Sequence, residues 1–250
     1  MIDVHCHIDA KEFDSNRDEI ISNAVKVGVT KIVSSALNID SLEKTFLIME
    51  KYPSLIFCTA SLDYTILDLD KVNEFMMEIR RRINKIIGIG EVGLDYFIFI
   101  KEEEKKKQET IFKNWISFSN ELNMPIVVHS RSAGKYAIKI LTEEGAKRVI
   151  MHAFDGSVGY AIEGVKKGFY FSIPPSIVRS EQKQKMAKHL PLDKILLESD
   201  APVLGPTKDI INTPSNIVIS AAKIAEIKKI PINEVINATT KNAQEIFNFK

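Results

Sequence analysis

The chain begins with a strand-like stretch, MIDVHCHID (Met1–Asp9), in which two histidines are separated by one residue. Side chains two residues apart on a β-strand point to the same face, so Asp3, His5 and His7 are expected to share one face. The intervening residues are expected to face a surrounding layer of helices: Val4, Cys6 and Ile8. Buried imidazoles and carboxylates need polar or metal partners, so this strand predicts a polar site inside the fold.

Seven further short apolar runs follow along the chain and are typical of strands. They are Lys31–Ala36, Leu55–Leu62, Ile86–Gly93, Pro125–Ser130, Arg148–Phe154, Phe169–Ile173 and Lys194–Ser199, after the first strand at Ile2–His7. Several are apolar at nearly every position, which favours strands of a parallel sheet covered on both faces.

Longer amphipathic stretches with apolar residues three and four apart separate these strands and predict helices. The predicted helices are Arg17–Val27, Leu42–Tyr52, Leu69–Asn84, Glu102–Leu122, Gly134–Glu144, Val158–Lys167 and Ser180–His189, with two more near Ser215–Ile227 and Ile232–Phe247. Eight βα units predict an α/β fold, a (β/α)8 or TIM barrel, as a single domain over residues 1–250 with an extra C-terminal helix. A doubly wound open sheet is the alternative, but the first strand lacks its typical glycine-rich phosphate loop.

Composition sets broad limits on function. With 45% apolar and 27% charged residues, the chain is typical of a globular protein with a substantial core. A net charge of +1 gives no overall field that attracts nucleic acid or acidic membranes. Cys6 and Cys58 form no CxxC motif, and no signal peptide or membrane-spanning run is visible. We therefore expect a cytoplasmic protein that needs neither a membrane nor an obligate protein partner.

The other histidines also fall at strand ends. His129 ends the fifth predicted strand and His152 lies near the end of the sixth, whereas His189 is expected on the surface late in a helix. One HxH pair arises by chance in many sequences, and one histidine at a strand end is often a core residue. Four histidines at the carboxyl ends of strands, where barrel enzymes carry their chemistry, indicate a metal site.

Carboxylates occupy matching positions. Glu91 interrupts the fourth strand and Asp200 follows the eighth, while Glu198 is a less favoured third candidate. A salt bridge to a lysine or arginine is the structural alternative for Glu91 and Asp200. Imidazole and carboxylate ligands suit Zn, Mn, Ni or Fe, and this number of ligands suits two divalent ions with a bridging carboxylate.

At this point five motifs identify a resemblance. DVHCHID, GEVGLDY, PIVVHSR, MHAFDGS and LLESDAP occur in the order and spacing of the TatD family of metal-dependent hydrolases, within the amidohydrolase-like TIM-barrel superfamily. The likeness extends from Ile2 to about Asn216. It implies a binuclear site with Glu91 as the bridge and with these ligands: His5, His7, Glu91, His129, His152 and Asp200.

The resemblance also implies a reaction. Relatives hydrolyse phosphodiester bonds of nucleic acid, typically as deoxyribonucleases or 3′→5′ exonucleases, and often with Mg²⁺. The chain is therefore expected to favour DNA over RNA as substrate, with hydroxide on the metals as nucleophile and Asp200 and Glu91 as catalytic residues. The chain departs from many relatives at Ala153, where a cysteine is common, and at Ile211, where an arginine precedes Asn212.

Two residues near the motifs are candidates for substrate contacts. Arg131 follows the fifth strand and is suited to bind a phosphate through two hydrogen bonds, although a surface arginine at a helix start has the same pattern. Tyr96, with Phe97, is suited to stack a base, but core packing is the favoured alternative. The basic runs Arg80–Arg82 and Lys105–Lys107 are expected to lie on solvated outer helix faces.

Two other functions remain open from the sequence. The same site can hydrolyse an amide or ester, for example in D-aminoacyl-tRNA. A non-catalytic, metal-binding scaffold belongs to a different class, and its expected signature is the loss of ligand residues, none of which is missing here.

Overall fold

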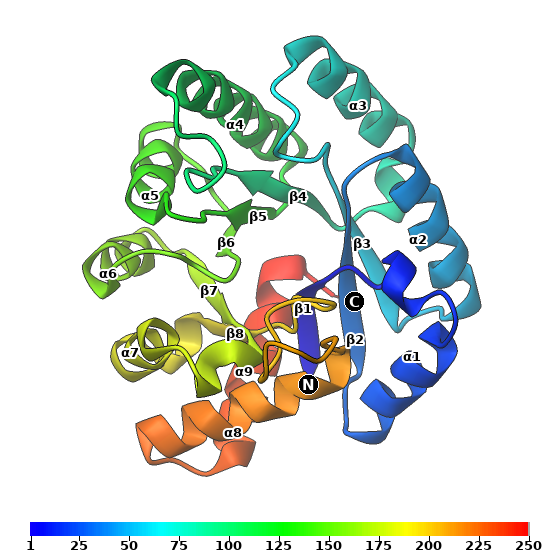
Figure 1. The fold of residues 1–250 in the computed structure, drawn as a ribbon, viewed down its shortest axis with the longest axis vertical. Helices are drawn as coiled ribbons and strands as arrows, with labels where there is room; N and C mark the ends of the chain where they lie inside the picture. The colour runs from blue at the N-terminus through cyan, green and yellow to red at the C-terminus, as the bar shows by residue number, and fades with distance from the viewer. Residues whose placement is uncertain (250) are drawn as a thin grey trace.

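The computed structural model describes residues 1–249, in which eight parallel strands form one sheet in sequence order (Figure 1). The strands are β1 (Ile2–Cys6), β2 (Lys31–Ala36), β3 (Ile56–Ala60), β4 (Gly88–Gly93), β5 (Ile126–His129), β6 (Val149–Met151), β7 (Tyr170–Ile173) and β8 (Ile195–Leu197). Seven of the eight are shorter than predicted, because their end residues leave the ladder and turn into loops.

Helices follow the strands and surround the sheet (Figure 1). They are α1 (Arg17–Lys26), α2 (Ile39–Lys51), α3 (Leu69–Arg81), α4 (Glu102–Leu122), α5 (Gly134–Glu143), α6 (Val158–Lys166), α7 (Glu181–His189), α8 (Ile217–Lys228) and α9 (Ile232–Phe247). This order confirms the predicted (β/α)8 barrel with an extra C-terminal helix. Among the described residues, no helix is both long enough and apolar enough to cross a membrane.

The seam between β8 and β1 is closed by residues that follow β8. The Asp200 amide donates to the His5 carbonyl at 3.0 Å, and the His7 amide donates to the Ala201 carbonyl at 2.8 Å. The Ser199 amide donates to Asp3 Oδ1 at 2.8 Å. These bonds hold Asp200 beside the two histidines of the first motif.

An inner apolar layer fills the barrel below these polar residues. It consists of Ile2, Val4, Val33, Val127, Ile150, Tyr170 and Leu196 from the strands, with Ala243, Ile246 and Phe247 from α9. Helix α9 contacts β1 and β8, and it lies behind them in Figure 1. The extra C-terminal helix therefore packs against the inner layer.

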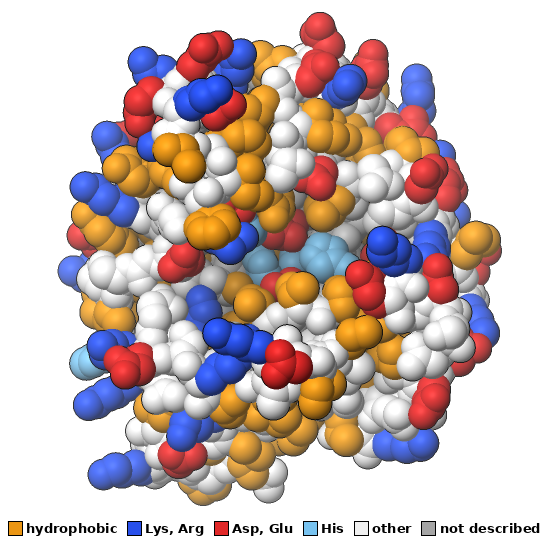
Figure 2. Space-filling model, viewed as in Figure 1, with side chains coloured by type: hydrophobic (Ala, Val, Ile, Leu, Met, Phe, Trp, Pro, Cys, Tyr) orange, Lys and Arg blue, Asp and Glu red, His pale blue; other side chains and the backbone are white. Residues whose placement is uncertain are grey.

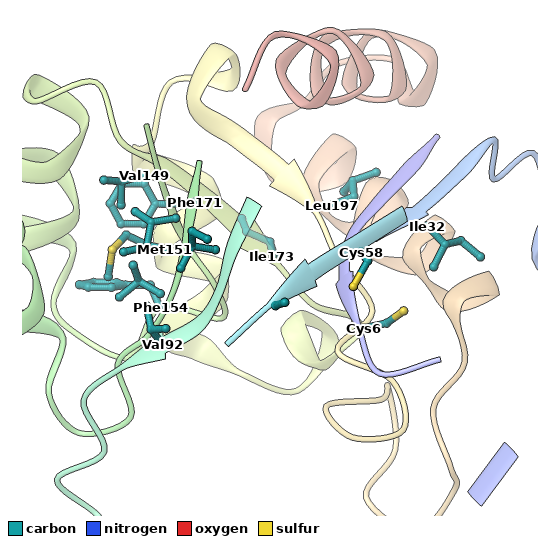
Figure 3. Packing of buried hydrophobic residues seen from close by; sticks show 14 of the residues in the cluster. Cys6, Ile32, Cys58, Val92, Val149, Met151, Phe154, Phe171, Ile173 and Leu197 are labelled. Atoms are coloured by element: carbon teal, nitrogen blue, oxygen red, sulfur yellow. The ribbon is translucent and has the colours of Figure 1, made fainter. Parts of the chain in front are cut away.

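A larger outer apolar core lies between the strands and the helices. Figure 3 shows part of it, with Phe154, Phe171 and Met151 in one group and the free cysteines Cys6 and Cys58 near Ile32. The rings of Phe154 and Phe171 meet edge to face, with centroids 5.3 Å apart. Because this core packs against the outer face of the strands, their carboxyl ends can carry polar residues that face the inside of the barrel.

The alternation predicted for β1 is wrong at Val4. Asp3 pairs with Ile32 and Cys6 pairs with Ser34, so three residue steps in β1 oppose two in β2. Such a bulge inserts one residue and re-aims side chains. Val4 joins Ile2 in the inner layer, and Cys6 faces the outer core as predicted. Asp3, between Ile2 and Val4, therefore does not share the face of His5 as predicted, and it bonds to Ser199 instead.

Candidate metal centre

All six predicted ligands meet at the carboxyl ends of the strands. His5 Nε2 lies 3.4 Å from Glu91 Oε2 and 3.4 Å from Asp200 Oδ1. His7 Nε2 lies 3.5 Å from the same Glu91 oxygen and 3.8 Å from Asp200 Oδ1. The first-strand histidines and the last-strand aspartate therefore form one cluster with one oxygen of Glu91.

The second oxygen of Glu91 faces the other two histidines. Glu91 Oε1 lies 2.8 Å from His129 Nδ1 and 3.5 Å from His152 Nε2. His152 Nε2 is also 3.9 Å from Asp200 Oδ2. Glu91 thus lies between the two pairs of histidines, as a bridging carboxylate requires.

Glu91 reaches this position because β4 also carries a bulge. Ile89 pairs with Ile126 and Val92 with Val128, so β4 has one residue more than β5 over this interval. Gly90 and Gly93 have φ of 143° and 144°. A Cβ at Gly90 would lie 2.7 Å from the Val127 carbonyl oxygen, and one at Gly93 would collide with the His129 carbonyl. The glycines of GIGEVG allow the close approach of β4 to β5.

The remaining ring nitrogen of each histidine has its own partner. His5 Nδ1 is 3.1 Å from Ser35 Oγ, and His7 Nδ1 is 3.1 Å from the Ser35 carbonyl oxygen. His152 Nδ1 is 2.8 Å from Glu198 Oε2, and His129 Nε2 is 3.1 Å from Asp95 Oδ2. Metal-binding histidines are usually oriented in this way by partners on their outer nitrogen.

The structure gives Glu198 a positioning role rather than a place among the ligands. Glu198 is fully buried and accepts hydrogen bonds from Ser172 Oγ at 2.6 Å and the Ala153 amide at 2.8 Å, besides contacting His152. Asp95, which sequence reasoning missed, accepts from the amides of Phe97 and Ile98 at 3.0 Å each. Its signal was a buried carboxylate two residues past β4, in GLDY.

The electrostatics reflect this concentration of opposite charges. Burial alone would lower the pKa of His5, but the neighbouring carboxylates of Asp200 and Glu91 raise it well above the usual range. Burial likewise opposes ionisation of Glu91, yet the histidines, His152 foremost, hold its pKa well below the usual range. For His129, burial is outweighed by Asp95 and Glu91, which raise the pKa to about 9. The carboxyl groups of Glu91 and Asp200 are therefore present as anions.

The donor set fits divalent metal ions. Two groups have ligand atoms within 4.8 Å of one another: His5 with His7 and Asp200, and His5 with Glu91 and His152. Among the described residues, His5 Nε2 is buried without a hydrogen-bond partner, although it faces two carboxylates. A metal ion satisfies such an atom, and mixed imidazole and carboxylate ligands suit transition metals.

A cavity of about 520 Å³ opens above the ligands, and Figure 2 shows histidine side chains at the bottom of a hollow in this face. Arg131 lines the cavity, and its guanidinium carbon lies 3.8 Å above the ring of Phe97. Tyr96 is not among the described residues that line it, because its hydroxyl donates to Glu109 at 2.6 Å and its ring packs near Tyr136. The alternative of packing therefore describes Tyr96 better than a substrate contact.

Residues expected to lie outside the site do so. His189 is exposed at the end of α7. Arg80 and Arg81 pair with Glu121 and Glu78 on the outer face, and Lys105 pairs with Glu102. These basic runs are solvated, ion-paired helix faces and take no part in the cavity.

Sequence comparisons connect this geometry with known proteins. A family model described as "TatD related DNase" matches residues 2–248. Deoxyribonuclease TATDN3 of Homo sapiens is 40% identical over 258 residues, covering 99% of this chain and 94% of that protein. The uncharacterized metal-dependent hydrolase MJ1582 of Methanocaldococcus jannaschii is 33% identical and covers 98% and 96% of the two chains.

Solved structures share the fold. The crystal structure of YjjV, a TatD homologue from Escherichia coli, superposes with a TM-score of 0.90 at 24% identity, covering 100% of this chain and 98% of that one. An organophosphorus hydrolase from Deinococcus radiodurans shares the barrel at a TM-score of 0.64 and 13% identity, covering 98% and 92% of the two chains. With its motifs, its ligand cluster and the family match in agreement, this chain belongs to the TatD family of metal-dependent hydrolases.

Proposed function

We propose that this protein hydrolyses phosphodiester bonds in nucleic acid, with DNA as the preferred substrate. The observation that carries the proposal is the cluster of four histidines around Glu91 and Asp200 at the bottom of an open cavity. The name of the human relative, a deoxyribonuclease at 40% identity, supports a phosphodiester as the bond. Relatives described as metal-dependent hydrolases support the requirement for metal.

The ligand set supports two divalent ions. His5 and His7 with Asp200 would hold one ion, His129 and His152 would hold the other, and Glu91 would bridge them. When bound, such ions supply Lewis-acid stabilisation of the charge that develops on the phosphate, and they lower the pKa of water. Zn²⁺, Mn²⁺, Mg²⁺, Ni²⁺ and Fe²⁺ all remain candidates for this donor set.

The chain's own residues then position the reacting groups. The Asp200 carboxylate, held below its usual pKa mainly by His152 and His5 despite burial, is the general base that accepts a proton from the attacking water. The Asp200 amide is fixed by the His5 carbonyl, so the carboxylate keeps its place beside the histidines. Arg131 at the cavity wall donates hydrogen bonds to a non-bridging oxygen of the scissile phosphate.

The size of the cavity is compatible with action on a single strand. Its volume of about 520 Å³ suits a ligand of nucleotide size. The polarity of digestion, 3′→5′, is proposed from the resemblance to TatD nucleases. The buried, free cysteines Cys6 and Cys58 fit the proposed location in the reducing cytoplasm.

A substrate panel tests this function. Purified protein with Mg²⁺, Mn²⁺ or Zn²⁺ is offered single-stranded DNA labelled at either end, RNA, a phosphodiester chromogen and D-aminoacyl-tRNA, with Asp200→Asn as control. Release of 3′-terminal nucleotides from DNA, lost in Asp200→Asn, is the expected result. Cleavage of D-aminoacyl-tRNA alone would show an ester hydrolase instead of a nuclease. If the protein binds no metal and cleaves none of the substrates, it is a non-catalytic scaffold.

A further inference from the structure

One wall of the cavity is basic and has no part in the metal centre. It is formed by the segment between β7 and α7 and by the first turn of α7, which contribute Ser176, Arg179, Ser180 and Lys183 to the lining. Figure 2 shows Lys or Arg side chains beside the hollow that contains the histidines. This basic wall is the feature that the reaction at the metal ligands leaves unexplained.

The two cations of the basic wall, Arg179 and Lys183, form no ion pair with a carboxylate within residues 1–249. Lys185, two residues further along α7, pairs with Glu181 at 3.7 Å and does not line the cavity. The basic wall therefore differs from the ion-paired outer faces of the helices.

Both cations are held in place by backbone carbonyls. Lys183 Nζ donates to the carbonyls of Ala153 and Phe154 at 2.7 Å each, and Arg179 Nε donates to the Gly205 carbonyl at 3.2 Å. These bonds leave one Nζ proton of Lys183 and the terminal nitrogens of Arg179 for a ligand. A site whose donors are oriented before binding loses less entropy when an anion arrives.

The charges of the cavity favour an anion beyond the one at the metals. Its lining includes the carboxylates Glu91, Asp155 and Asp200. Two of them are metal ligands, and Asp155 Oδ2 accepts a hydrogen bond from the Ser132 amide at 2.7 Å. Divalent ions at the ligand carboxylates would offset their negative charge, which would leave the two cations of the basic wall available to an anionic substrate.

We propose that Arg179 and Lys183 form a second phosphate subsite, which binds the phosphate one nucleoside away from the scissile phosphate. This inference rests on the proposed function and specifies its substrate as a nucleotide that carries phosphate on both its 3′ and 5′ sides. The volume of about 520 Å³ is sufficient for one nucleoside with two phosphates. Arg131 binds the scissile phosphate, while the basic wall binds the adjacent phosphate.

Binding without turnover tests the subsite. The metal-loaded protein is titrated calorimetrically with thymidine 3′,5′-bisphosphate and with each thymidine monophosphate. We expect the bisphosphate to bind at least about tenfold more tightly than the better monophosphate, because a second charge-assisted contact is made. Arg179→Gln and Lys183→Met are each expected to remove most of this preference while monophosphate binding stays unchanged.

Lys185→Gln is the matched control, since this lysine lies on the same helix outside the cavity. It should keep the full preference. Equal affinity of the wild type for bisphosphate and monophosphates would overturn the subsite, as would equal losses for all ligands in Arg179→Gln. Metal content, measured on every variant, shows that the metal centre is intact.

Cleavage separates the subsite from the reaction. The dinucleotide TpT is compared with pTpT and TpTp, and a preference for one of the phosphorylated forms, lost in Arg179→Gln, supports the subsite. Failure of the wild type to cleave any of the three would overturn the proposed function alone, because the bisphosphate preference is measured without turnover.

Discussion

The two ends of the barrel are built from the same eight strands but bury opposite kinds of side chains. At the carboxyl ends, histidines and carboxylates meet around Glu91 below an open cavity. Deeper in the barrel, side chains of the strands and of the end of α9 form the inner apolar layer. In β5 the change occurs between Val127, in the inner layer, and His129, in the metal centre.

This difference separates stability from chemistry. Burying charged groups costs free energy, which apolar burial in the layers around them offsets. The inner layer and the outer core are therefore expected to carry most of the folding free energy. The metal centre is expected to carry the activity, and substitutions at the two ends should have different effects.

The largest effect is expected at the metal centre. His5→Ala removes the residue shared by both groups of candidate ligands. Hydrolytic activity should fall about a thousandfold or more, because the loss of a ligand disturbs the whole site. Mass spectrometry of bound metal together with kcat/KM measures the effect, and His189→Ala is the exposed control. Normal activity with a full metal complement would place the chemistry elsewhere.

The second effect should appear in stability alone. Phe247→Ala removes a large side chain of α9 from the inner layer, which should lower the free energy of unfolding by about 3 kcal/mol. Denaturant titration measures the loss, and Ile232→Ala on the same helix is a more exposed control. Activity per folded molecule should stay near wild type. A parallel loss of bound metal would show that the two ends are coupled.

A smaller effect is expected at Glu198, which is fully buried in the barrel and contacts a histidine of the metal centre. Glu198 orients His152 from a fully buried position, so Glu198→Gln should weaken metal affinity by about 10- to 100-fold. Competition with a fluorescent chelator measures this affinity, with the exposed Glu181→Gln as control. Complete loss of one bound ion would show that Glu198 is itself a metal ligand, as the sequence analysis allowed.

The smallest effect concerns the basic wall. Burial lowers the pKa of Lys183 to about 8, against the opposing influence of nearby carboxylates. The ammonium group is charged below this pKa, so bisphosphate affinity should decline a few-fold as pH rises from about 7 to about 9. Lys183→Arg keeps its charge over this range and should remove that part of the decline. The same pH dependence in both proteins would assign it to another group.

Much of the fold follows from local patterns. The eight apolar runs and the helices between them were predicted because periodicity needs only neighbours in the chain. The strand ends and the direction of Val4 were not predicted, because the bulge in β1 arises from its pairing with β2. For Tyr96, packing was the favoured interpretation, but its hydrogen-bond partner Glu109 in α4 was not predicted, because it lies 13 residues further along the chain.

The sequence by itself predicted which residues would meet as candidate metal ligands. The four histidines with Glu91 and Asp200 are chemical types that a buried strand end tolerates only with partners, and their positions at strand ends bring them together in a parallel barrel. Only the tertiary structure decided what orients them and what surrounds them. Ser35, Asp95 and Glu198 contact the histidines, and Arg179 and Lys183 reach the cavity, through the packing of separate βα units. Such contacts join residues far apart in the chain, and no local pattern encodes them.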